Sequence, residues 1–145
     1  MKGISTPFCD WLKCRLVELS EGTLSSELVY DERDTDLGTS IKRAVNSKLG
    51  CCVVMSAPSL SQADGSTAED TRYRISVECA ILHNAALSPE LDTVTLSEHF
   101  FRALAAAHFE LEYIFPANVT ADRLTHTLNG TKWLHQFTIN YTTLI

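Results

Sequence analysis

The middle of this sequence has few basic side chains, and the chain has no long apolar run. Residues 51–112 hold three Lys or Arg against nine Asp or Glu, and the 145-residue chain carries a net charge of −6. A surface that follows a phosphate backbone needs clustered Lys and Arg, so this composition argues against a nucleic-acid partner. No stretch approaches the roughly 18 consecutive apolar residues of a membrane span. We therefore expect neither nucleic acid nor membrane as a partner.

The sequence also lacks the usual signs of secretion and of zinc binding. Residues 1–7 have no continuous apolar segment of the kind that a secretory signal contains, which favours a cytosolic protein. The five cysteines form no Cys-x-x-Cys pair, and no His stands at the spacing of a zinc site. We expect free thiols that are mostly buried, with Cys51 and Cys79 inside strand-like runs.

Catalytic signatures are missing as well. The chain contains no Gly-x-Ser-x-Gly elbow, no phosphate-binding loop, no Gly-x-Gly-x-x-Gly and no His-Glu-x-x-His. Its apolar fraction of 45% is that of an ordinary globular domain, and no linker or repeat divides it. The sequence therefore predicts one domain over residues 1–145 that is not an enzyme and holds no cofactor.

Three segments have the apolar period of a helix. Thr6 and Pro7 are typical of a helix start, and apolar side chains then recur every three or four residues over 7–20. The same period runs over 37–49, where Gly50 suits a left-handed residue just after a helix. A third helix is predicted over 96–110, because Thr95 and Glu98 have the spacing of a capping box.

Strand signals surround a long polar segment. Residues 51–57 form a short apolar run typical of a buried strand, and 72–82 alternate between apolar and polar side chains. Residues 24–30 fit a short strand or an extended segment, and 31–36 form a charged connector. Residues 58–70 are rich in Ser, Asp and Gly, and we expect a long loop there.

The end of the chain predicts a β-hairpin, because Asn129-Gly130 is a preferred two-residue turn between strands rich in Thr and aromatic residues. Counting outward from that turn gives the register: Leu128 opposite Thr131, His126 opposite Trp133, Leu124 opposite His135 and Asp122 opposite Phe137. The element order indicates an α+β fold, a two-layer sandwich of about three helices on a mixed or antiparallel sheet of four or five strands.

This register puts Asp122, His126 and His135 on one face of the hairpin. Two diagonal imidazoles roughly 7–8 Å apart, with a carboxylate nearby, are the beginnings of a metal site. The alternative is that the two histidines lie at the margin of the core or of a subunit interface. The second interpretation needs no metal, and it is the one we favour, so we expect no metal site.

Two groups of polar residues are candidates for contacts with a partner. Arg72, Arg74 and Glu78 lie on the polar face of the alternating strand, where they form ion pairs within the chain or a contact with another subunit. The loop 58–70 offers no catalytic group, but a loop of this length is either a segment that orders against a partner or a disordered one. Its candidate contact residues are Gln62, Asp64 and Ser66.

The pattern over residues 37–145 resembles a known family. A helix ends at Gly50, an apolar strand 51–57 follows, and after a polar loop the strand 72–82 reads Arg-Tyr-Arg-Ile-Ser-Val-Glu-Cys-Ala-Ile-Leu. A helix over 96–110 and a closing strand complete the succession, which resembles small tail-terminator and tail-completion proteins of long-tailed phages and prophages. The helix 7–20 is longer than that pattern needs, so it either packs on the sheet or serves an interface.

The resemblance implies a structural protein of the virion tail and the host cytoplasm. Members of that group look like α+β sandwiches that form hexameric rings on the end of a tail tube and join it to the head or connector. On this basis we expect homo-oligomers, with 58–70 facing the tube or its lumen. Two other functions stay open: an adaptor or immunity-type protein whose acidic middle binds a basic partner, and a metal-dependent enzyme that uses the Asp122, His126 and His135 face.

Overall fold

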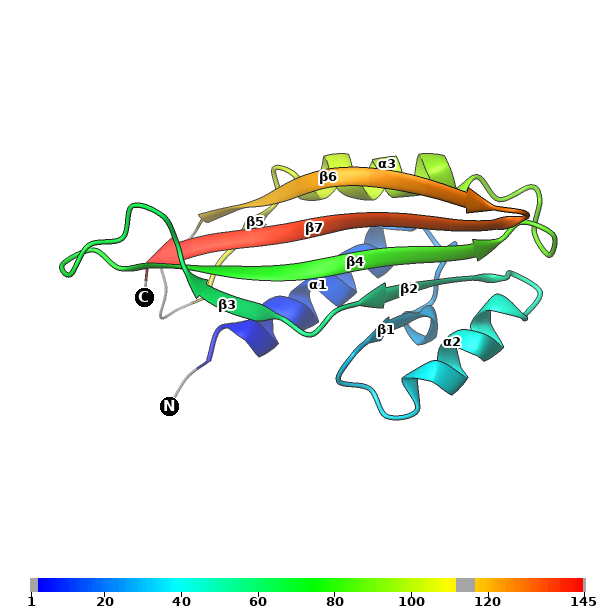
Figure 1. Cartoon of the computed structure of the whole chain (residues 1–145), viewed down its shortest axis with the longest axis horizontal. Helices are drawn as coiled ribbons and strands as arrows, with labels where there is room; N and C mark the ends of the chain where they lie inside the picture. The colour runs from blue at the N-terminus through cyan, green and yellow to red at the C-terminus, as the bar shows by residue number, and fades with distance from the viewer. Residues whose placement is uncertain (1–2, 112–116, 145) are drawn as a thin grey trace.

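The structure is a computed structural model that describes residues 3–111 and 117–144 (Figure 1). Its helices are α1 (Ser5–Leu19), the 3-10 helix η1 (Ser26–Leu28), α2 (Leu37–Val45) and α3 (Thr93–Leu104). Its strands are β1 (Val29–Asp31), β2 (Cys51–Met55), β3 (Ser59–Gln62), β4 (Arg72–Asn84), β5 (His108–Phe109), β6 (Ala117–Asn129) and β7 (Lys132–Leu144). None of these helices combines the length and the apolarity that crossing a membrane requires.

The strands form one mixed sheet in the order β1-β2-β4-β7-β6-β5, and β3 pairs with β4 outside that path. Only β1 and β2 run parallel, with α2 as the connection between them, and every other pair is antiparallel. The predicted α+β class is confirmed. The predicted number of strands is wrong, because the described residues form seven. The additional strands are short or polar and leave little hydrophobic pattern.

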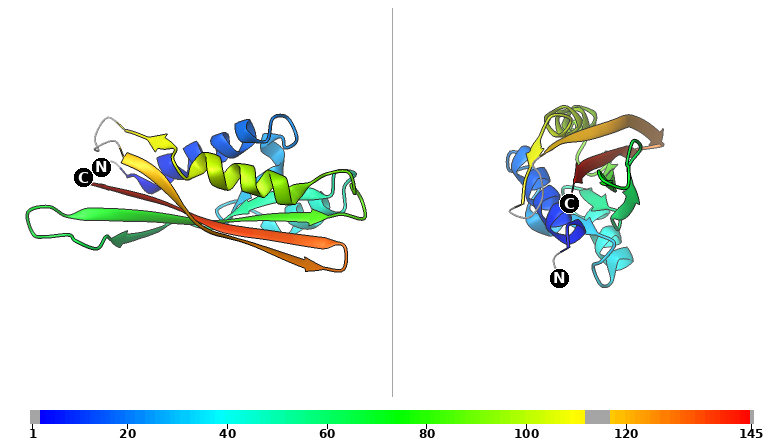
Figure 2. Two further views of the ribbon diagram at one scale, coloured as in Figure 1. Left: turned by 90° about the horizontal axis from the view of Figure 1, so that it is seen from above. Right: turned by 90° about the vertical axis from the view of Figure 1, so that its left-hand side faces the viewer.

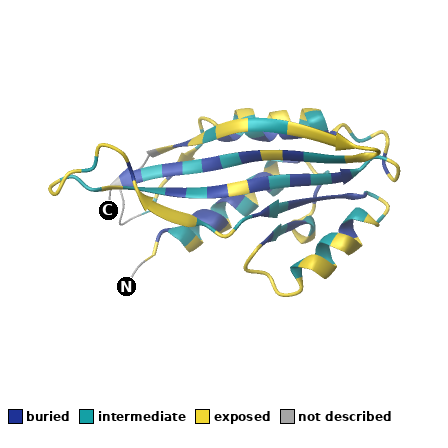
Figure 3. Ribbon diagram, viewed as in Figure 1, coloured by how far each residue is buried: buried dark blue, intermediate teal, exposed yellow. Residues whose placement is uncertain are grey.

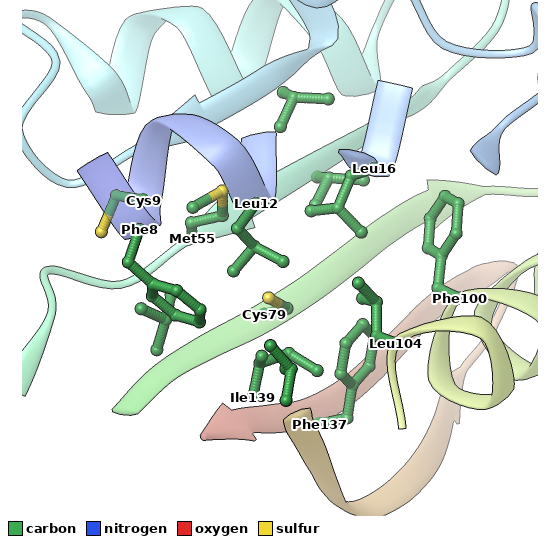
Figure 4. Packing of buried hydrophobic residues seen from close by; sticks show 14 of the residues in the cluster. Phe8, Cys9, Leu12, Leu16, Met55, Cys79, Phe100, Leu104, Phe137 and Ile139 are labelled. Atoms are coloured by element: carbon green, nitrogen blue, oxygen red, sulfur yellow. The ribbon is translucent and has the colours of Figure 1, made fainter. Parts of the chain in front are cut away.

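Helices α1 and α3 cover one face of the sheet, which we call the inner face (Figure 2). Phe8, Leu12 and Leu16 of α1 are fully buried against it, as are Phe100 and Leu104 of α3. The apolar side chains of the central strands complete this core: Ile75, Val77, Cys79, Ile81, Phe137, Ile139 and Tyr141 (Figure 4). The long first helix therefore packs on the sheet, which is one of the two roles that its length suggested.

The opposite, outer face is polar. Glu78 and Gln136 are exposed there, and Ser76 donates a hydrogen bond to Asn140 across the β4–β7 pair (Oγ to Oδ1, 2.6 Å). The side chains of β4 alternate between buried and accessible over most of its 13 residues (Figure 3). The predicted one-faced alternation is confirmed, and the strand continues two residues beyond its expected end.

Helix α3 begins and ends earlier than the sequence predicts. The carboxylate of Asp92 accepts a hydrogen bond from the backbone N–H of Thr95 (3.0 Å), so Asp92 caps the helix and Thr93 is its first residue. At the other end, Phe109 leaves the helix for β5 and packs edge-on against Tyr141, with ring centroids 5.0 Å apart. Burial of this ring outweighs the helix propensity of the preceding alanines.

The hairpin turn lies one residue further along the chain than predicted. Asn129 pairs with Lys132, so the turn residues are Gly130 and Thr131, and of these two only Gly130 has a positive φ (+65°). Glycine at the first central position is typical of a type II′ turn, whereas Asn129-Gly130 would have formed type I′. The partner of each β6 residue therefore shifts by two, which keeps its face.

A β-bulge changes the face of the residues beyond it. Thr125 pairs with Gln136 but Asp122 pairs with Thr138, so two residues of β6, Arg123 and Leu124, stand opposite one residue of β7. Arg123 adopts a positive φ of 38° at this point. Because side chains alternate along a strand, the inserted residue moves Asp122 to the outer face. The predicted pairing of Asp122 with Phe137 is therefore wrong: the shifted turn alone would place Asp122 opposite Ile139, and the bulge places it opposite Thr138.

The charged segment 31–36 is anchored at its start. Asp31 is buried and holds Arg33 through both carboxylate oxygens, with Nη2 to Oδ2 at 2.7 Å. The Arg33 guanidinium holds the pKa of the Asp31 carboxyl below its usual range. The sequence predicted a solvated connector over 31–36, and this is wrong for Asp31. Its pairing in β1 with Met55 of β2 makes it part of the sheet, where its side chain is buried.

The cysteines are all free thiols, as predicted. Four are buried, and Cys14 is exposed on α1. Burial raises the pKa of Cys51 to about 12 and that of Cys52 to about 11, so both thiols stay protonated at neutral pH.

Gly50 lets the chain turn closely from α2 into β2. Its φ is +63°, and a methyl group there would lie 3.1 Å from the Asn84 carbonyl oxygen and 3.1 Å from Cβ of Leu87. Gly22 also has a positive φ (+89°), but a methyl group on it meets no atom within 4 Å.

We expect Gly22→Ala to lose about 1 kcal/mol of unfolding free energy through backbone strain, and Gly50→Ala to lose about 2 kcal/mol or more because contact adds to strain. Urea denaturation of both variants measures the difference. Equal losses would contradict the close approach at Gly50.

Candidate functional site

Residues 59–76 form a projecting β-hairpin, which we call the arm (Figures 1 and 3). Strand β3 pairs with the first part of β4, from Ser59 opposite Ser76 to Gln62 opposite Tyr73. The sequence predicted a loop without regular structure over 58–70, and that is wrong for 59–62. All four residues of β3 are exposed, so the strand buries nothing that would mark it in the sequence.

The end of the arm, residues 63–71, is held by its own hydrogen bonds; we call this segment the arm tip. The Ser66 hydroxyl accepts from the backbone N–H of Arg72 (2.9 Å) and lies 2.7 Å from the Ala63 carbonyl oxygen. Ser66 therefore shapes the tip. Asp64 and Glu69 are exposed, and within the described residues neither forms an ion pair.

The remaining predicted contact residues fall into two places. Gln62 and Arg72 lie on the arm, where Arg72 is 3.5 Å from Asp70. Arg74 also lies on the arm, opposite Ser61, whereas Glu78 lies further along the outer face of β4. In the described part of the chain neither Arg74 nor Glu78 has a charged partner within 4.0 Å. The arm thus brings Gln62, Asp64, Ser66 and Arg72 together, and Glu78 stands apart from them.

The outer face around Glu78 is hollowed. The hollow has a volume of about 410 Å³ and is lined by side chains from β2, β4, β6 and β7, including Ser56, Arg123 and Gln136. The bulge at Arg123 and the curl of the sheet shape it. It is a wide polar surface, suited to contact with a macromolecule more than to enclosure of a small substrate.

The candidate metal-binding face does not form. His126 and His135 are direct cross-strand partners, with their Nδ1 atoms 2.8 Å apart, and the bulge moves Asp122 to the other face of the sheet. Across residues 3–111 and 117–144, no three His, Cys, Asp or Glu side chains gather as a metal site requires. The expected trio of Asp122, His126 and His135 is therefore corrected to a histidine pair.

That pair is one end of a chain of hydrogen bonds through the protein interior. Beyond His126, Nε2 of His135 lies 2.8 Å from Oγ1 of Thr93, which lies 2.9 Å from Nδ1 of His83. Nε2 of His83 lies 2.9 Å from Oγ of Ser88, and Ser88 donates to the carbonyl oxygen of Leu49. This histidine chain joins β6, β7, α3 and β4 to Leu49, which lies between α2 and β2.

The direction of every hydrogen bond in the histidine chain follows from its last acceptor. The Leu49 carbonyl only accepts, so the single Ser88 hydroxyl proton goes to it, and Nε2 of His83 must donate to Ser88. Nε2 of His83 also faces the Ser88 carbonyl at 3.1 Å, which again requires an N–H there.

The rest of the histidine chain then has one arrangement of neutral rings. Nδ1 of His83 accepts from the Thr93 hydroxyl, whose oxygen accepts from Nε2–H of His135. Nδ1 of His135 accepts in turn from Nδ1–H of His126. Every donor has an acceptor, as buried polar groups require.

His135 is the most strongly perturbed member of the histidine chain. Its ring is fully buried, and Trp133 stacks on it with centroids 5.3 Å apart. Burial first, and then the nearby His126 and His83, lower the pKa of His135 to about 4 from its usual 6.5, against the opposing effect of Asp92. The ring is therefore neutral at physiological pH, as the hydrogen-bond directions require.

Sequence reasoning missed three members of the histidine chain: His83, Ser88 and Thr93. A signal existed for His83, because it continues the inward positions Ile75, Val77, Cys79 and Ile81 of β4. Nothing in the sequence marks Ser88 or Thr93, since their role depends on where α3 begins against the sheet.

In comparisons with known proteins, no protein-family model matches this chain, and no curated protein matches it.

Thr93 is the centre of the histidine chain, because its hydroxyl bonds to two imidazoles. Thr93→Val keeps the shape but leaves two buried ring nitrogens without a partner, so we expect it to lose about 2–4 kcal/mol of unfolding free energy. Thr93→Ser keeps the hydroxyl and should lose about 1 kcal/mol. Urea denaturation measures both. Equal stability of the two variants would contradict the hydrogen-bonding role.

The pKa of His135 makes stability depend on pH. As the pH falls from 6.5 toward 4, the unfolded chain binds a proton at His135 and the folded protein does not. Unfolding free energy should therefore fall over this window, by up to about 3 kcal/mol. Denaturant titrations at several pH values should show a smaller loss for His135→Gln. The exposed His99→Gln is the control, and a wild-type slope in His135→Gln would contradict the assignment.

Proposed function

We propose that the protein is a structural subunit that assembles with copies of itself into a ring, of the kind that completes the tail of a long-tailed phage and joins tail tube to head. The observation that carries this proposal is the arm: a β-hairpin that extends beyond the body of the subunit and exposes polar side chains (Figure 1). Its partners would be further copies, tail-tube protein and connector protein.

The arm is preformed, which favours a contact role. Eight consecutive residues of its loop, 64–71, connect strands that are already paired at Ala63 and Arg72 (N to O, 2.8 Å). Ser66 and Thr67 fix the tip through side-chain hydrogen bonds to Arg72 and Asp70. A segment that is ordered before binding loses less conformational entropy when a partner arrives.

The sheet adds further contact surface. β3 is an exposed edge strand, and edges of this kind pair or pack with neighbouring chains unless something covers them. The outer face, with Arg74, Glu78 and its hollow, has no covering helix layer of the kind that α1 and α3 give the inner face (Figure 2). The exposed edge of β3 and the uncovered outer face both support a subunit whose free surfaces are buried against neighbouring subunits.

The mass of the protein in solution tests this proposal. Light scattering across a concentration range, with negative-stain imaging, should find a closed oligomer such as a hexamer, or rings. A monomer at every concentration would contradict the proposal and would favour the monomeric adaptor instead.

Removal of the arm tip tests whether the arm makes the contacts between subunits. We expect replacement of residues 64–71 by Asn-Gly to leave the circular dichroism spectrum unchanged, because the core lies elsewhere, and to reduce the oligomer at least about tenfold. Glu98→Ala, an exposed change on α3, is the control. An oligomer that survives loss of the tip would overturn the role of the arm.

A further inference from the structure

The two ends of the molecule have opposite charge. The arm tip contains Asp64, Glu69 and Asp70 and no basic residue. At the other end of the long axis, the segment 37–50, which holds α2, contains three basic side chains and no acidic one (Figure 1). In a chain with a net charge of −6, the segment 37–50 is thus a local concentration of positive charge.

The basic end contains a groove, which we call the basic groove. It has a volume of about 350 Å³ and lies between α2 and the ends of β4 and β7. Its floor is apolar, with Val45, Leu82 and Trp133, and Lys42 and Lys132 line it as well. Within the described residues, neither lysine forms an ion pair, so both ammonium groups are available to an acidic partner.

Exposed leucines occur at the same two ends. Among the described residues, the large hydrophobic side chains that stay exposed are Leu60 (53%), Leu87 (41%) and Leu128 (52%). Leu60 lies on β3 of the arm, whereas Leu128 pairs with Trp133 of the groove and Leu87 donates its N–H to the carbonyl of Asn84, which also lines the groove. Each charged surface thus has apolar side chains beside it, as interfaces require.

We propose that the basic groove binds the arm of a second copy of this chain, with Asp64 and Glu69 of the arm tip against Lys42 and Lys132, and Leu60 against the apolar side chains beside Trp133. This inference rests on the proposed ring function and names the surfaces that join one subunit to the next. Acidic and basic groups of comparable number meet, and their attraction selects this pairing over like-charged contacts.

The placement of the two surfaces requires a head-to-tail contact. The arm projects at one end of the long axis, and the ends of β4 and β7 that form the groove lie at the other (Figures 1 and 2). An arm therefore does not reach the groove of its own subunit. Two different surfaces that bind each other leave one of each free on every dimer, so further copies add until the rotation between subunits closes a ring; without closure the contacts give an open filament.

Charge reversal tests the contact. The groove variant carries Lys42→Glu with Lys132→Glu, and the arm variant carries Asp64→Lys with Glu69→Lys. None of these four side chains has an ion pair within the described residues, so both variants should fold. Each variant alone should self-associate at least about tenfold more weakly than wild type in sedimentation or light scattering. The matched controls are Arg102→Glu and Glu98→Lys on α3, which should assemble normally.

A mixture of the two variants gives the sharper result. The acidic groove of one variant then matches the basic arm of the other, and the wild-type arm and groove that remain also match. Equimolar mixing should therefore restore an oligomer with alternating subunits, which closes for an even number such as six. High salt should weaken the wild-type oligomer and the mixture alike, because screening acts on both.

The outcomes separate this inference from the proposed function. Loss of assembly in each variant with restoration on mixing supports the contact. If wild type forms a ring and both variants still form it, the contact is wrong and the ring function stands. A wild-type monomer at every concentration, or a two-fold dimer that closes on itself, overturns both, and the groove would then be open to an acidic ligand or another protein.

Discussion

The pairing of β4 with β7 along 13 residues is the constraint on which the rest of the structure depends. Its inner face carries the apolar side chains that hold α1 and α3, and its outer face stays polar. Strand β2 pairs only with residues 79–83 of β4, because it has five residues. The first part of β4 is therefore left to β3, and together they form the arm. The arm, on which the proposed ring assembly rests, therefore exists because β4 is longer than β2.

The inner face changes character along the same pair of strands. Near the arm it is closed by aromatic rings, with Phe8 and Phe109 packed against Tyr141. Near the β6–β7 turn the rings are replaced by the histidine chain, whose directions are set by the Leu49 carbonyl. No buried side-chain nitrogen or oxygen in the described part of the chain lacks a partner, so this polar region is stable as long as the His135 ring stays neutral. The two ends thus differ in chemistry inside as well as in charge outside.

Sequence reasoning succeeded where one face of one element carried the information. The alternation of 72–82, the apolar stripe of the first helix and the positive φ of Gly50 each follow from local chemistry, and the structure confirms them. The second helix, expected through residue 49, ends at Val45 with Asn46 as its cap, so Gly50 does not terminate it. Sequence reasoning failed at β3, because Ser-Leu-Ser-Gln buries no side chain. It failed again at Asp122, because nothing in the neighbouring residues marks the bulge that moves this carboxylate away from His126. In both cases the local structure is set by pairing with a strand that is distant in the sequence.

The sequence by itself determined the α+β class, the helical stripes, the alternating strand and the net negative charge, because periodicity and composition act within a few residues of each position. Only the tertiary structure decided that His126 opposes His135, that Thr93 joins His135 to His83, and that an acidic tip and a basic groove lie at opposite ends. Those relations depend on strand register, on the start of α3 and on the length by which β4 exceeds β2. Strand register depends on which side chains of all the paired strands become buried, and the sequence of one segment does not carry that information.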